Sequence, residues 1–154
     1  MNREEVFQRI SKQVGRQIVS CNCERCKAQC RRTPCLGTPQ DILALIDAGY
    51  IDKVCYTEWA AGIILGFTKE PIPMIQIKNL KDGSCVLYHD GYCEVHENGL
   101  KPTEGKLSHH EVFDRELKPE YNLTFQVALE WTKEENFGII SEIADKLSEY
   151  LNKQ

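Results

Sequence analysis

The sequence contains no run of about 18 apolar residues, the length that a membrane-spanning helix needs. Its first residues, MNREEVFQRISKQVGRQ, are charged and amphipathic, without the apolar segment and cleavage site of a secretory signal. Both absences predict a cytoplasmic protein with no membrane partner, in which thiols stay reduced. Disulfides are therefore not expected among the eight cysteines, and clustered cysteines are more often metal ligands or catalysts.

An excess of positive charge is also missing. The chain has 19 Lys and Arg against 23 Asp and Glu, a formal net charge of −4, which argues against a nucleic-acid partner. Motifs of common enzymes are absent as well: there is no glycine-rich phosphate loop, dinucleotide fingerprint, Gly-x-Ser-x-Gly elbow or His-Glu-x-x-His pair. The sequence therefore names no reaction.

The first half of the chain predicts two helices. Asn2 and Glu5 have the spacing of a capping box, and apolar residues then recur at helical spacing. These are Val6, Phe7, Ile10, Val14 and Ile18. A second helix is expected to begin at Thr38, a natural N-cap followed by proline, and to stop near Gly49.

The remaining segments predict a mixed fold. Residues 54–67 suit a short helix or a strand, and residues 71–79 suit an edge strand. CVLYHDGYCEV carries the Asp-Gly signal of a β-hairpin, residues 97–108 suit an extended polar loop, and residues 123–151 suit helices with a break near 136–138. The helical face there comprises Phe137, Ile140, Ile143, Ala144, Leu147 and Leu151. We therefore expect one small α+β domain spanning residues 1–154, mainly helical, in which a Cys-rich loop and a short β-hairpin close around a metal site.

Residues 21–35, CNCERCKAQCRRTPC, place five cysteines in fifteen positions. Isolated cysteines are usually buried and inert, but the polar and charged residues between these cannot form a core. Cys23 and Cys26 have the spacing of a chelating pair, and Cys26 and Cys30 share one face of a helical turn. Cys85 and Cys93 bracket the expected hairpin and would form a second pair if they faced each other across it.

The candidate metal ligands are therefore Cys21, Cys23, Cys26, Cys30, Cys35, Cys85 and Cys93. Soft thiolates suit a zinc ion or an iron–sulfur cluster and do not distinguish them. His96, close behind Cys93, is a further candidate, whereas His109 and His110 are expected to be solvated or to cap a helix. Cys55 lies in an apolar stretch and is expected in the core.

Thiol–disulfide catalysis through Cys23 and Cys26 is an alternative. Such a motif normally follows a strand and opens a helix, whereas here a predicted helix precedes it and further cysteines crowd it. The pattern therefore favours chelation over redox exchange.

Taken in order, the stretches CNCERCKAQC, LGTPQDI and CVLYHDGYCEVHE resemble the YkgJ-type cysteine-cluster family of zinc- or iron-chelating domains. The resemblance covers roughly residues 21–97 and implies chelation; the family has no generally established reaction. The family commonly has adjacent cysteines at the end of its first cluster, whereas here three residues separate Cys26 from Cys30. It also commonly continues with Arg-Pro-x-x-Cys-Arg, where this chain has KPTEGK, so Gly105 replaces one expected ligand.

The glycine at position 105 suggests a metal-dependent enzyme as one further hypothesis, and the basic residues of the cysteine-rich segment suggest a protein-interaction module as another. Either Cys35 or Cys21 supplies the missing ligand, or the metal keeps an open position near Gly105 and the protein is a metal-dependent enzyme. The general bases for such an enzyme would be Glu97, Glu104, His96 or His109. Alternatively, a zinc-stapled basic surface carrying Arg25, Arg31 and Arg32 docks an acidic protein partner.

Overall fold

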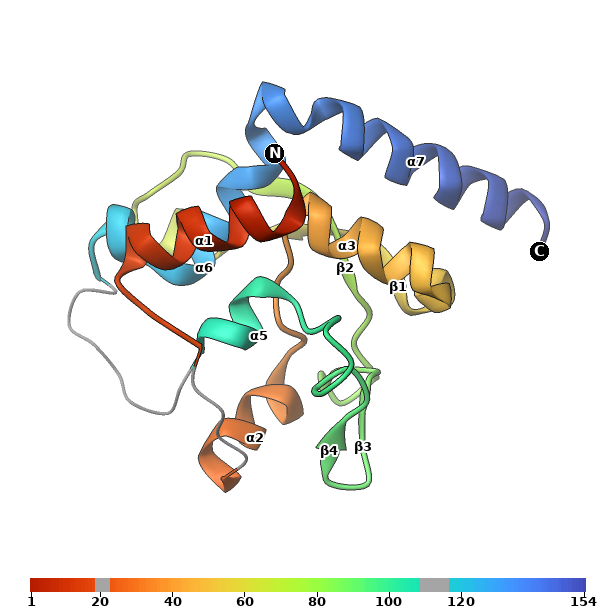
Figure 1. Ribbon diagram of the computed structural model, residues 1–154, viewed down its shortest axis with the longest axis horizontal. Coiled ribbons are helices and arrows are strands. Elements are labelled where there is room, and N and C mark those ends of the chain that lie inside the picture. Colours follow the sequence, from red (N-terminus) through yellow and green to blue (C-terminus); the bar gives the residue numbers. More distant parts are fainter. Residues whose placement is uncertain (19–22, 109–116) are drawn as a thin grey trace.

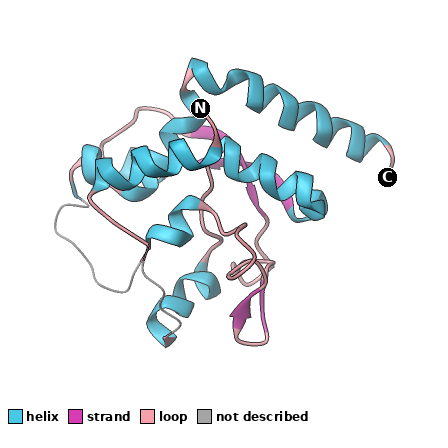
Figure 2. Cartoon of the chain, in the orientation of Figure 1, coloured by secondary structure: helices cyan, strands magenta, loops and turns pink. Residues whose placement is uncertain are grey.

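The computed structural model describes residues 1–18, 23–108 and 117–154, except for the side chains of Arg25, Cys26 and Gln29. It is an α+β fold, mainly helical, with two small antiparallel sheets (Figures 1 and 2). The helices are α1 (Arg3–Val14), α2 (Glu24–Arg32), α3 (Pro39–Leu45), α4 (Ala61–Ile64), α5 (Thr103–Leu107), α6 (Leu123–Leu129) and α7 (Phe137–Asn152). The strands are β1 (Val54–Trp59), β2 (Ile72–Ile77), β3 (Tyr88–His89) and β4 (Tyr92–Cys93).

Both predicted N-terminal helix starts are confirmed. The Asn2 side chain accepts a hydrogen bond from the Glu5 amide, and the Glu5 carboxylate accepts one from the Asn2 amide. At α3, Thr38 and Asp41 form a second capping box. The helix continues through a π-helical turn (Ile46–Tyr50) that includes Gly49 at φ 99°, close to the predicted stop. Ile18 lies beyond the end of α1 and is 61% exposed, so its assignment to the buried stripe is wrong.

The two sheets show which of the middle segments are strands. β1 pairs with β2 from Val54 opposite Ile77 to Trp59 opposite Ile72, so the first part of residues 54–67 is a strand. The predicted hairpin is present as β3 and β4, with Tyr88 opposite Cys93. Cys85 is not opposite Cys93, because it lies before the hairpin and bridges to Asn79.

Two segments that we expected to be loops contain helices. In the Cys-rich segment, α2 has Glu24 in its first turn and Arg31 and Arg32 in its last, which complements the helix dipole. The segment expected to be an extended polar loop contains α5, and its residues 102–105 are buried. It is buried because the Thr103 amide and hydroxyl both donate to the Asp41 carboxylate inside the fold.

Two apolar clusters form the core. One lies around the β1–β2 sheet, α3 and α7, and the other lies between α1 and α6. Figure 1 shows α7 beside α3, with the end of α7 extending past the rest of the fold. On the predicted apolar face of α7, Ile143 is fully buried, whereas Phe137 at the start of the helix is 52% exposed and Leu151 at its projecting end is 64% exposed.

In Figure 1, α2, α5 and the β3–β4 hairpin occupy the lower half of the molecule, below the layer of α1, α3 and α6. Of the predicted metal ligands, Cys26 and Cys30 lie in α2 and Cys93 in β4, whereas Cys23, Cys35 and Cys85 lie in the segments next to these elements. None of the helices in the described ranges is long and apolar enough to cross a membrane.

Candidate metal centre

Four cysteines from separate segments gather where α2 meets the hairpin. Cys30 lies in the last turn of α2, Cys35 in the segment after it, Cys85 before β3 and Cys93 on β4. The Cys30 thiol is hydrogen-bonded with Cys35 and with Cys93, and Cys85 interacts electrostatically with Cys30 and Cys93. We call these four residues the thiol cluster; none of them is in a disulfide.

Backbone and side-chain contacts hold the two halves of the thiol cluster together. The Cys85 amide donates to the Cys30 carbonyl at 2.9 Å, which fixes the end of α2 against the chain before β3. One residue on, the Arg31 guanidinium donates to the Tyr88 hydroxyl at 3.3 Å and lies 6.0 Å from the centre of that ring. The proximity of the four thiols therefore follows from the fold.

Burial and mutual contacts raise the pKa values of Cys30, Cys85 and Cys93. Cys30, Cys35 and Cys85 are no more than 8% exposed. The hydrogen bond with Cys35 is the main cause that raises the pKa of Cys30 to about 11, and burial raises the pKa of Cys85 to about 11. The pKa of Cys93 is also raised, chiefly by its hydrogen bond with Cys30. A metal would have to displace the protons of these thiols, as thiolate ligation requires.

The thiol cluster is not arranged as a preformed cage. In the described part of the chain, no group of three or more His, Cys, Asp and Glu side chains is arranged to hold a metal ion. The donor set is nonetheless chemically suited to one: four sulfur atoms match a structural zinc site or an iron–sulfur cluster and do not suit magnesium or calcium.

Gly105 explains how this chain can lack the cysteine expected there. A Cβ atom on Gly105 would lie 3.0 Å from the Cys35 sulfur and 3.0 Å from Cε of Lys101. The sulfur of Cys35 thus lies against the position that the missing side chain would occupy. Of the two replacements proposed from the sequence, this geometry favours Cys35; Cys21 lies outside the described residues.

Substituting Gly105 with alanine should therefore destabilise the protein. Alanine is favoured over glycine in a helix by up to about 1 kcal/mol, but here its methyl group must displace the Cys35 sulfur or the Lys101 stem, at about 1–3 kcal/mol. Gly138 in α7 is the matched control, because a Cβ there meets nothing within 4 Å. Urea unfolding should show Gly138→Ala at least as stable as wild type and Gly105→Ala less stable; the reverse order would contradict the packing described.

The raised thiol pKa values predict how the stability of the metal-free, reduced protein depends on pH. The ordinary cysteine pKa is 9.0, and the folded-state pKa values of Cys30 and Cys85 are about 11. Folding favours the neutral thiols, so this contribution is complete below pH 9 and is lost as the pH rises through about 11. Unfolding free energies should fall over that window, and less steeply in Cys85→Ala. An identical slope in the variant would show that its thiol makes no such contribution.

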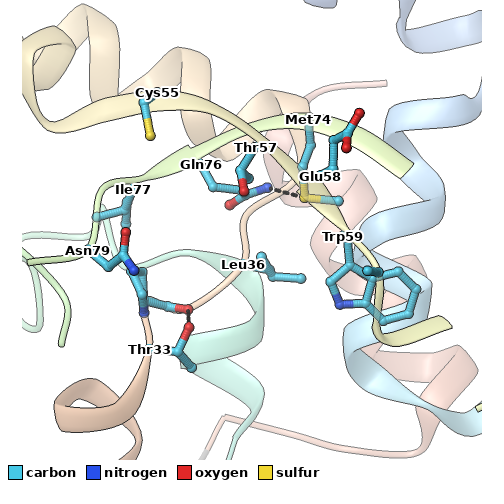
Figure 3. A pocket seen from close by; sticks show the side chains of 12 residues that line it. Thr33, Leu36, Cys55, Thr57, Glu58, Trp59, Met74, Gln76, Ile77 and Asn79 are labelled. Carbon is cyan, nitrogen blue, oxygen red and sulfur yellow. Dashed lines mark hydrogen bonds between the residues drawn. The ribbon is translucent and has the colours of Figure 1, made fainter. Parts of the chain in front are cut away.

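The other predicted cysteine ligands are placed only in part. Cys23 is half-buried just before α2, and Cys21 and the side chain of Cys26 lie outside the described residues. The prediction that Cys55 lies in the core is wrong. Its side chain is half-buried and lines a cavity of about 230 Å³ between the β1–β2 sheet and residues 33–36 (Figure 3). Alternation along β1 places Cys55 on this partly open face, while its neighbour Val54 is buried.

The histidines have different environments. Nδ1 of His96 lies 3.0 Å from the Lys101 ammonium, and burial together with Lys101 lowers the pKa of His96. His89 is exposed at the tip of the hairpin, near Glu94. His109 and His110 lie outside the described residues.

In two of the sequence-based alternatives, one candidate residue is engaged in contacts within the fold. Glu104 is buried, and its carboxylate accepts hydrogen bonds from the Leu36 amide and the Thr124 hydroxyl, so it is a structural group rather than an available base. Arg31 pairs with Glu24 at 2.6 Å as well as with Tyr88, which reduces the positive charge of the basic surface. Docking of an acidic partner stays a prediction.

Lys101 is a residue of the site that the sequence analysis did not single out. Its ammonium lies close enough to Cys30 and Cys93 to lower their pKa values against the larger raising effects. Its position in KPTEGK, where the resembling family commonly has arginine, is the signal that could have identified it. Comparison with protein-family models, with curated proteins and with solved structures found no match to this chain.

Proposed function

We propose that this protein binds a metal, either a zinc ion or an iron–sulfur cluster, through Cys30, Cys35, Cys85 and Cys93. The observation that carries the proposal is the convergence of these four thiols from separate segments around Cys30. Zinc would tie α2 to the hairpin, so that its binding energy becomes folding energy. An iron–sulfur cluster would supply electron-transfer chemistry.

The environment of Cys30 supports a ligand role over an inert buried thiol. Cys30 and Cys35 belong to neither of the apolar clusters, although both are buried. Among the described side chains of α2, only Cys30 is buried. A polar helix of nine residues is marginal by itself in water, so a metal bound through Cys30 would be an effective means of holding it in place.

Hydrogen–deuterium exchange tests this proposal directly. Protein isolated without oxygen is compared with the same protein after chelator treatment under reducing conditions. We expect the amides of α2 to exchange much faster after chelation, while those of α7, which packs on the opposite side of the fold, change little. Equal protection of α2 in both samples, together with no metal released by the chelator, would refute the proposal.

A further inference from the structure

A second cavity, of about 290 Å³, lies beside the thiol cluster. It is lined by the basic residues His96, Lys101 and Lys106, by Gly99 and Gly105, and by the acidic residue Glu97. Its volume is at the small end of the range for ligand pockets. Lys101 precedes α5, and Gly105 and Lys106 lie within it.

Both lysines are half-buried, and no carboxylate in the described part of the chain forms an ion pair with either of them. Within the described ranges, neither Lys101 nor Lys106 forms an ion pair: Nζ of Lys101 contacts His96, and Nζ of Lys106 lies 5.1 Å from the centre of the Phe7 ring. Asp41 and Glu4 act on Lys106 from beyond ion-pair distance. Burying an ammonium group without a counter-charge is unfavourable, and burial accordingly lowers the pKa of Lys106.

The thiol cluster accounts for only one of these lysines. Lys101 is the cation that acts on Cys30 and Cys93, and it would offset the negative charge of thiolate ligands. Lys106 acts on none of the cluster thiols whose shifts are resolved. Its half-buried charge at the wall of a cavity therefore needs another explanation.

His96 adds a neutral hydrogen-bonding group to the same wall. The Lys101 ammonium can only donate, so Nδ1 of His96 accepts and the neutral ring carries its proton on Nε2. The described residues that line the cavity thus include two lysines and a histidine with one N–H to donate, and Glu97, the acidic residue among them, is exposed.

We propose that this cavity binds a small anion through a phosphate or carboxylate group, held by Lys101 and Lys106 with His96 at its wall. The anion would supply a counter-charge to both ammonium groups. Charge-assisted hydrogen bonds to it would be stronger than hydrogen bonds between neutral groups. Anion binding at this cavity does not require a metal in the thiol cluster. The anion proposal therefore goes beyond the chelation proposal, and each can be refuted without the other.

The test is a titration of the isotope-labelled, full-length protein with inorganic phosphate and, separately, with citrate, followed by amide chemical shifts. We expect saturable binding of at least one probe, with the largest shifts at residues 96–106. Lys106→Met should weaken that binding by about tenfold or more, as expected for the loss of one charge-assisted contact, and Lys106→Arg should largely retain it. Binding of phosphate alone, or of citrate alone, identifies which of the two groups the site accepts.

Lys78→Met is the matched control, because Lys78 is also half-buried but lies after β2, outside this cavity. It should change affinity less than twofold. Absence of saturable binding of both probes, or an equal loss in Lys78→Met and Lys106→Met, would overturn the inference. The metal content of each variant is measured in parallel; unchanged metal with lost anion binding separates this site from the thiol cluster.

Discussion

Replacing Cys30 with serine is expected to lower the metal content of the purified protein by at least about tenfold. Cys30 is at the centre of the thiol cluster, in contact with both Cys35 and Cys93, and a serine hydroxyl is a poor ligand for the metals that thiolates select. The free energy of unfolding should fall by several kcal/mol as well, since metal binding and folding are coupled. Metal analysis and urea unfolding of the variant measure the two effects.

Cys55→Ser is the matched control for this substitution. Cys55 is a described, half-buried thiol that lines the cavity beside β1 and is not part of the thiol cluster. Its replacement should leave the metal content unchanged. If Cys30→Ser retains metal at the wild-type level, or if both variants lose it equally, the thiol cluster is not the metal site.

Replacing Asp41 with alanine is expected to cost about 3–5 kcal/mol of stability, the range for an uncompensated loss of one partner in a buried charged network. The Asp41 side chain is 1% exposed and accepts hydrogen bonds from the Arg3 guanidinium and from the Thr38 amide. It also accepts from the amide and hydroxyl of Thr103, so one carboxylate joins α1, α3 and α5. Alanine leaves all of these donors without their acceptor.

Asp47→Ala provides the comparison, because Asp47 is exposed and forms an ion pair with Lys146 at the surface. Exposed ion pairs contribute up to about 1 kcal/mol, so this variant should remain close to wild type in urea unfolding. A similar small loss for Asp41→Ala would show that the buried network does not hold α5 against the helices.

Features that depend on neighbouring residues could be predicted from the sequence. In the capping boxes at Asn2 and Thr38 the hydrogen-bonding partners are three residues apart, and the hairpin turn is formed by two consecutive residues, Asp-Gly. The local spacing alone therefore identifies these features. The edge strand was likewise recognisable from its alternation and its prolines, and it forms β2 (Ile72–Ile77).

Features that depend on distant residues could not be predicted. The segment with α5 has the composition of a loop, and it is buried only because Thr103 meets Asp41, 62 residues away. Within the candidate site, local spacing identified the cysteines but not their partners: Cys85 meets Cys30 rather than facing Cys93, through a backbone hydrogen bond that no motif encodes. The role of Cys35 likewise depends on its position against Gly105 in three dimensions.

The measurement that tests the central claim most directly is the metal content and visible absorption spectrum of protein purified without oxygen. The chelation proposal predicts either near-stoichiometric zinc in a colourless protein or iron with matching sulfide in a brown protein of broad absorption. Absence of both metals, with all eight thiols freely titratable in the folded protein, would contradict it.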